Sequence, residues 1–489
     1  MSLTPTTPMA NPMDVLLVDT HSPALNADNS LSADDPRSTV HNHRTFLGHP
    51  VGLFVLFLTE MWERFSFYGM RALLVLYMTK HLIASAQGGG YVFGFGALKT
   101  YLEAMFGPLA IQPMASQIYG LYTGLVYMTP LFGGLLADKI LGQRKTVVVG
   151  GVLMAIGHFL MAIESMFLLA LLFLILGNGC FKPNISTQVG NLYSADDPRR
   201  DRAFTIFYMG VNLGAFFSPI VCGTLGQVYG WHYGFGAAGV GMVLGLMVYL
   251  FGQKYLAADQ KMLSKAGQAA PEKLTIKEWR AIGGLIALCA LNIVFWGVYE
   301  QQGNTMQIFA DKNVNWMIFG WEMPSTWFQS LNPLFIFALA PLLNIYWGWQ
   351  SNRNRGAGTI AKMAIGCFVL GASFLILIYA THGMEASTKI SFLWLVGCTL
   401  VYTLAELYLS PIGLSLVTKV APARLVGLLM GVWFLSSFFG NSLAGTIGMY
   451  YERMPQEKFF ALLAVLGVAA GLAILALQKP IKKAIGGNV

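Results

Sequence analysis

Four charged side chains lie inside one long apolar run near the start of this 489-residue chain. The run extends from about residue 49 to 78 and contains Glu60, Glu63, Arg64 and Arg71. It is long enough for a helix that crosses a bilayer. A charge at mid-membrane costs roughly 2.5–3.5 kcal/mol on insertion scales, so each is by default a candidate functional residue. Glu60 and Arg64 have the i,i+4 spacing of a helical ion pair, although a buried pair could also serve only to orient the helix.

A lysine and a glutamate in two other apolar runs each lie close to a proline. Lys182 directly precedes Pro183, and Glu406 lies four residues before Ser410, which precedes Pro411. Helices broken at corresponding places in two halves of a chain indicate the central site of a transporter, so we expect a break at each proline. The lysine and the glutamate would bind the two ends of a zwitterion such as a peptide, unless each is neutralised locally.

Arg71 and Glu300 are predicted to lie at the same depth. Each comes late in an apolar run that we expect to run outward, which places both in the extracellular half of the membrane. The two residues come from different halves of the chain. We therefore expect an Arg–Glu pair that closes the outer side, and protonation of the glutamate would weaken it.

The composition indicates a polytopic membrane protein, whose helices would hold the charged residues named above. The chain is 55% hydrophobic and 11% charged, with a mean hydropathy of +0.57. No phosphate-binding glycine-rich loop, metal-ligand cluster or nucleophile–base arrangement is evident, so we expect neither an ATP-driven pump nor an enzyme, and no cofactor or metal. The five cysteines lie in apolar runs and are interpreted as packing residues.

Twelve apolar helices are expected in two six-helix bundles. We predict a disordered cytoplasmic tail at 1–45, an N-terminal bundle at 46–252, a polar connector at 253–280, a C-terminal bundle at 281–478 and a second tail at 479–489. The predicted spans are 50–79, 112–136, 146–165, 167–188, 203–228, 232–252, 281–303, 326–350, 359–381, 389–415, 424–447 and 458–478. The segment 82–111 is expected to pack over the outer face.

Lysine and arginine are concentrated in the loops of one side. The loops and tails on the predicted inner side hold 22 lysines and arginines and those on the outer side hold six, which predicts cytoplasmic termini. The net charge of +8 is thereby explained by topology rather than by nucleic-acid binding.

The charged segment also carries a family resemblance. Residues 59–71, TEMWERFSFYGMR, resemble the E-x-x-E-R-F-x-Y-Y-G signature of proton-dependent oligopeptide transporters, a branch of the major facilitator superfamily. A second signature of that family is matched by residues 204–215, FTIFYMGVNLGA. The resemblance covers about residues 48–478. Phe67 replaces the first tyrosine of the signature, which predicts a binding site with one hydroxyl fewer.

The resemblance implies a major facilitator fold and a proton-coupled symporter that imports di- and tripeptides by alternating access. It further implies a monomer that spans the inner, or plasma, membrane many times, with peptides, protons and the lipid bilayer as its partners. The proton would be carried by Glu60, Glu63, Glu300 and Glu406 with Arg64. Peptide would be bound by Arg71, Tyr68, Tyr127, Lys182, Asn212, Glu300, Asn332, Glu406, Ser410 and Trp433.

Two alternatives stay open. The chain could carry another solute, such as nitrate, a drug or an amino acid, but the charged cluster together with Lys182 and Glu406 disfavours an anion such as nitrate. It could instead be a peptide sensor that does not transport. A sensor would usually carry a large soluble signalling domain, and the 45-residue tail is too short for one.

Overall fold

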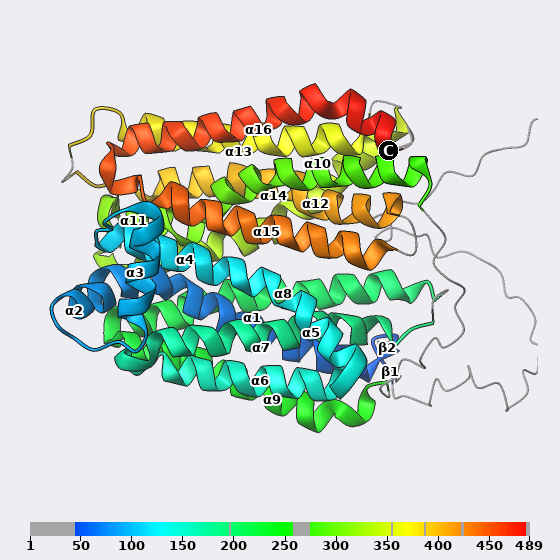
Figure 1. Ribbon diagram of the computed structural model, residues 1–489, viewed down its shortest axis with the longest axis horizontal. Coiled ribbons are helices and arrows are strands. Elements are labelled where there is room, and N and C mark those ends of the chain that lie inside the picture. Colours follow the sequence, from blue (N-terminus) through cyan, green and yellow to red (C-terminus); the bar gives the residue numbers. More distant parts are fainter. Residues whose placement is uncertain are drawn as a thin grey trace, which may run out of the picture.

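The computed structural model describes residues 45–194, 197–257, 274–353, 356–385, 388–421 and 425–485. The predicted N-terminal tail lies outside the described residues except for Thr45, and so do residues 258–273 of the predicted connector and 486–489 of the predicted C-terminal tail. The described part is almost entirely helical, as expected. It consists of long helices that run roughly parallel to the longest axis of the molecule (Figure 1).

The helices fall into two groups that follow the chain order. The first group contains α1 (Val51–Tyr77), α4 (Ile111–Met128), α5 (Pro130–Leu136), α6 (Gln143–Leu160), α7 (Phe167–Gly190), α8 (Arg199–Thr224) and α9 (Trp231–Gly252). The second contains α10 (Ile276–Tyr299), α12 (Leu331–Asn352), α13 (Thr359–Thr381), α14 (Phe392–Val420), α15 (Val426–Gly448) and α16 (Gln456–Ile485). In Figure 1 the first group, blue to green, lies below the second, green to red.

Short elements complete the chain. The helices α2 (Ile83–Gln87), α3 (Phe95–Phe106) and α11 (Thr305–Asn313) lie at the end of the molecule opposite the C-terminus (Figure 1). Two-residue strands form three small pairs: β1 (Thr45–Phe46) with β2 (His49–Pro50), β3 (Val314–Asn315) with β6 (Ile390–Ser391), and β4 (Met317–Ile318) with β5 (Trp321–Glu322). The predicted segment 82–111 thus forms two short helices beside the ends of the long ones.

Helices lie at all twelve predicted ranges. Among the described residues, nine helical segments are long and apolar enough to cross a membrane. The helices α1, α6 and α15 are not among the nine, and α1 carries the four charges that made it a candidate site. Twelve crossings with cytoplasmic termini therefore stay a prediction. At the C-terminus, α16 continues to Ile485, past the predicted end at 478, and its last turn carries Lys482 and Lys483, which favour a helix C-terminus.

The predicted proline breaks are wrong. Pro183 lies inside the continuous helix α7, and α14 passes through position 411 without interruption. A proline cannot donate to the carbonyl four residues earlier, which in α7 belongs to Gly179. That carbonyl lies so close to Gly133 of α5 that a β-carbon there would clash with it. The close approach leaves room for a weak Cα–H···O contact from Gly133 in place of the missing hydrogen bond.

Candidate functional site

A cavity of about 600 Å³ lies between the two groups of helices. Its wall is built from α1, α4, α7 and α8 on one side and from α10, α12, α14 and α15 on the other. All predicted site residues line it except Glu63: Glu60, Arg64, Tyr68, Arg71, Tyr127, Lys182, Asn212, Glu300, Asn332, Glu406, Ser410 and Trp433. Residues that are far apart in the sequence are therefore brought to one place.

On α1, Arg64 lies between the two glutamates of the charged cluster. Its Nε is 3.2 Å from Oε1 of Glu60, which gives the expected i,i+4 pair. Its Nη2 donates to Oε1 of Glu63 at 2.7 Å, and Nε makes a second bond to the same carboxylate. Asn178 of α7 also donates to Glu63, at 3.5 Å. Glu63 is fully buried behind the arginine, so Glu60 is the carboxylate of this cluster that faces the cavity.

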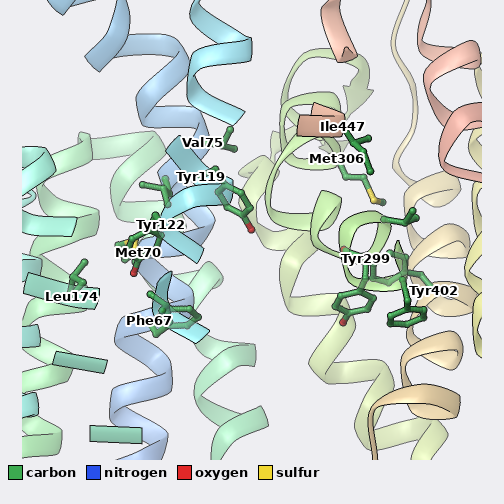
Figure 2. Packing of buried hydrophobic residues seen from close by; sticks show 14 of the residues in the cluster. Phe67, Met70, Val75, Tyr119, Tyr122, Leu174, Tyr299, Met306, Tyr402 and Ile447 are labelled. Carbon is green, nitrogen blue, oxygen red and sulfur yellow. The ribbon is translucent and has the colours of Figure 1, made fainter. Parts of the chain in front are cut away.

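Phe67 is not among the residues that line this cavity. Its side chain is 7% exposed and is absent from the cavity wall. Figure 2 shows it among the buried residues of the first helix group. The guanidinium of Arg64 lies 5.2 Å from the centre of its ring, and the ring meets that of Tyr68 edge-on. The phenylalanine thus packs beneath the charged cluster. That it deprives the binding site of a hydroxyl stays a prediction.

Lys182 enters the cavity from α7. Its Nζ lies 4.7 Å from the centre of the Tyr127 ring, a cation–π contact between α7 and α4. Within the described residues it forms no ion pair at 4.0 Å or less. An ammonium that contacts a ring and has no carboxylate within 4.0 Å among the described residues is available to a ligand anion.

Glu406 enters from α14 and is held by neutral donors. Its Oε2 accepts from the Tyr299 hydroxyl at 2.7 Å and from Nδ2 of Asn332 at 2.9 Å. The same amide also reaches Oγ1 of Thr403 at 3.1 Å. Neither contact supplies a positive charge, so the local neutralisation considered above is not found among the described residues. Lys182 and Glu406 thus face one cavity from opposite helix groups.

Arg71 and Glu300 close one end of the cavity. Nη2 of Arg71 lies 2.5 Å from Oε2 of Glu300, and Nε of Arg71 donates to the hydroxyl of Tyr119 at 2.8 Å. The two charged side chains are 11% and 3% exposed. The pair that depth arguments predicted is therefore present, and it joins α1 to the end of α10.

Further contacts between the helix groups lie near this pair. Ser116 donates to Oδ1 of Asn304 at 2.8 Å, and Nε1 of Trp327 donates to Thr224 at 2.8 Å. The helices α4 and α15 approach so closely that a β-carbon at Gly120 would lie 2.7 Å from the carbonyl oxygen of Asn441. These contacts make a tight closure at the end of the molecule that holds α2, α3 and α11.

The other end of the cavity is accessible. Tyr208 and Phe204 line the cavity on α8, and they are 49% and 39% exposed, whereas Glu300 is 2% exposed. Both residues lie toward the start of α8 at Arg199. Solvent therefore reaches the cavity from the side where α8 begins.

Sequence reasoning missed two tyrosines of this site. Tyr119 supports Arg71, and it lies eight residues, or about two helical turns, before Tyr127 on the same helix face. Tyr299 directly precedes Glu300 and binds Glu406. Their neighbours in the sequence were the available signal, but the hydrogen bonds depend on how the helices pack.

Comparison with known proteins gives consistent matches over nearly the whole chain. A sequence model of the POT family matches residues 144–262 and 256–462. The peptide transporter YePEPT of Yersinia enterocolitica is 32% identical over 511 residues, which cover 90% of this chain and 96% of that protein. A di-/tripeptide transporter of Lactococcus lactis subsp. cremoris is 33% identical over 508 residues, covering 91% and 98%. A crystal structure of a peptide transporter POT in complex with sulfate has a TM-score of 0.79 and 32% identity, covering 91% and 98%.

Proposed function

Because this chain belongs to the POT family of transporters, we propose that it imports di- and tripeptides together with protons by alternating access. The family assignment makes it a membrane transporter and not an enzyme. One observation carries the substrate class: Lys182 and Glu406, neither of them paired with an opposite charge among the described residues, face the same cavity from opposite helix groups.

The ligand would lie between these two charges. Lys182 would bind the peptide carboxylate, and Glu406 with Asn332 would bind the ammonium group. Tyr68, Tyr127 and Trp433 would contact the apolar parts, and the polar groups of Asn212 and Ser410 would bind the peptide amide. A volume of about 600 Å³ lies within the range of ordinary small-ligand pockets and accommodates two or three residues.

Proton coupling would use the carboxylates of the same cavity. Glu60 faces the cavity and shares Arg64 with Glu63, so a proton on either glutamate changes how strongly the other binds the guanidinium. Protonation of Glu300 would weaken its bond to Arg71 and favour opening of the closed end. Each positive charge carried inward across 100 mV supplies about 2.3 kcal/mol.

In the proposed topology the structure is an inward-facing state. With twelve crossings in two six-helix bundles and both termini in the cytoplasm, α8 begins on the cytoplasmic side, where Tyr208 and Phe204 are accessible. The Arg71–Glu300 end would then be extracellular. The protein would act as a monomer in the inner, or plasma, membrane.

The function is tested by uptake into proteoliposomes. With an inward proton gradient and a negative interior, labelled dialanine should accumulate, a protonophore should abolish accumulation, and trialanine should compete. Accumulation of free alanine or of nitrate in place of dialanine would identify a transporter of another solute. Saturable binding of dialanine without any uptake would identify a sensor.

A further inference from the structure

We propose that Tyr299 is a positioning residue that couples the ligand group at Glu406 to the closed end of the cavity at Arg71–Glu300. The proposal rests on the proposed function, because the ligand group at Glu406 is taken to be a peptide ammonium. The observation behind it is that one side chain binds Glu406 while the next residue in the chain binds Arg71.

The side chain of Tyr299 is bound directly to the candidate ligand group. Its hydroxyl donates to Oε2 of Glu406 at 2.7 Å, and Nδ2 of Asn332 lies 3.3 Å from the same hydroxyl. Tyr299 is 7% exposed and lines the cavity. A ligand ammonium that draws the carboxylate of Glu406 into the cavity would therefore act directly on this hydrogen bond.

The backbone of Tyr299 is held by α14, the helix that also carries Glu406. The hydroxyl of Tyr402 donates to the carbonyl oxygen of Tyr299, and the two rings stack at 4.6 Å with an interplanar angle of 19°. Figure 2 shows the two rings side by side in the second helix group. Tyr402 and Glu406 lie one turn apart on α14, so Tyr299 is bound at both ends to one face of that helix.

Tyr299 is also the last residue of α10. The α-helix ends there, and Glu300–Gly303 continue as a tighter 3-10 turn. Since consecutive Cα atoms are only 3.8 Å apart, a shift of Tyr299 moves the start of this turn and with it the carboxylate of Glu300. Changes of helix type within a transmembrane segment often mark a hinge.

A plain packing role would lead to a different outcome. The ring of Tyr299 also stacks on Phe295, so it contributes to the core whether or not the hydroxyl transmits anything. Replacement by phenylalanine keeps the ring and the backbone acceptor and removes only the hydroxyl. The coupling proposal predicts a defect in this variant that is confined to transport, whereas a packing role predicts little change.

The test compares wild type with Tyr299→Phe in binding, uptake and conformation. In Tyr299→Phe the Kd for dialanine should stay within about threefold of wild type. The Vmax of gradient-driven uptake should fall by about tenfold. Spin labels on cysteines introduced at the exposed positions Ala162 and Lys389 should report a distance distribution at the closed end that dialanine shifts in wild type but no longer shifts in the variant.

Two further variants keep the result interpretable. Asn332→Ala removes the other donor to Glu406 and leaves the Tyr299 bond, so it should raise KM while dialanine still shifts the distances. Tyr379→Phe changes a tyrosine that is 73% exposed and should behave as wild type. If wild type itself neither binds nor takes up dialanine, the proposed function fails. If wild type transports and Tyr299→Phe keeps both its Vmax and its dialanine-dependent shift, the coupling role of Tyr299 is overturned.

Discussion

The guanidinium of Arg71 and the carboxylate of Glu300 meet at 2.5 Å and connect the two helix groups at the closed end of the cavity. The contact is almost excluded from solvent, and its partners come from opposite halves of the chain. Removing one partner of a buried pair costs about 3–5 kcal/mol, because the other charge is left uncompensated. The closed end is therefore sensitive to the charge state of Glu300.

Glu300→Gln should favour opening of this end. The variant keeps the size of the side chain but removes the negative charge opposite Arg71, whose other contacts among the described residues are the hydroxyl of Tyr119 and the rings of Tyr68 and Tyr119. Double electron–electron resonance between labels on the outer ends of the two helix groups should show a longer mean distance than in wild type. The charge swap Arg71→Glu with Glu300→Arg should restore the short distance, though not uptake, because Arg71 also lines the cavity. An unchanged distribution in Glu300→Gln would rule out a gating role.

Neutralising the glutamates of α1 should separate proton coupling from peptide exchange. Glu60→Gln and Glu63→Gln each keep a hydrogen-bonding group beside Arg64 but remove the site that takes up a proton. Uptake driven by a pH gradient should be abolished, while exchange of labelled for unlabelled dialanine should continue. Both activities are measured in the same proteoliposomes. Full proton-driven accumulation in the double variant would contradict the assignment of proton coupling to Glu60 and Glu63.

The charges at the two ends of the ligand site predict selectivity for the peptide termini. Glu406→Gln should weaken binding of dialanine by about tenfold or more, which corresponds to about 1.4 kcal/mol for a lost charge-assisted hydrogen bond. The affinity for N-acetylated dialanine should change much less, so the variant discriminates poorly between the two. Lys182→Gln should behave in the same way toward C-amidated dialanine. Calorimetry on both variants with free and blocked peptides measures this. Wild-type preferences in both variants would contradict the assignment.

The charged residues of the site could be predicted from the sequence, whereas the packing of the residues around them could not. Charges inside apolar runs are rare and costly, so Glu60, Arg64, Lys182 and Glu406 were visible without a structure, and helix length placed Arg71 and Glu300 at one depth. The direction of Phe67, the continuity of α7 through Pro183 and the bond from Tyr299 to Glu406 were not predicted, because they depend on side-chain rotamers and on close contacts between helices that are far apart in the sequence.

A histidine in β2, just before α1, offers a separate test at the predicted cytoplasmic end. Nδ1 of His49 lies 2.8 Å from the hydroxyl of Tyr193, in the loop between α7 and α8. Arg199 of α8 donates to the carbonyl oxygen of Gly48 at 3.1 Å and pairs with Asp197. The hairpin of β1 and β2 is thereby attached to the start of α8.

The protonation of His49 should make this attachment weaker in acid. Burial, and next the charge of Arg199, lower the pKa of His49 below its usual 6.5, although Asp197 opposes this. The folded protein therefore favours the neutral ring, and the resulting stability is fully present above about pH 6.5 and is lost as pH falls through the lower folded-state pKa. His49→Gln keeps a group that can bond to Tyr193 but does not titrate. The thermal unfolding midpoint of wild type should fall more steeply than that of His49→Gln between about pH 7.5 and pH 5, whereas carboxylates elsewhere act equally on both. Parallel curves for the two proteins would show that His49 is not the titrating group.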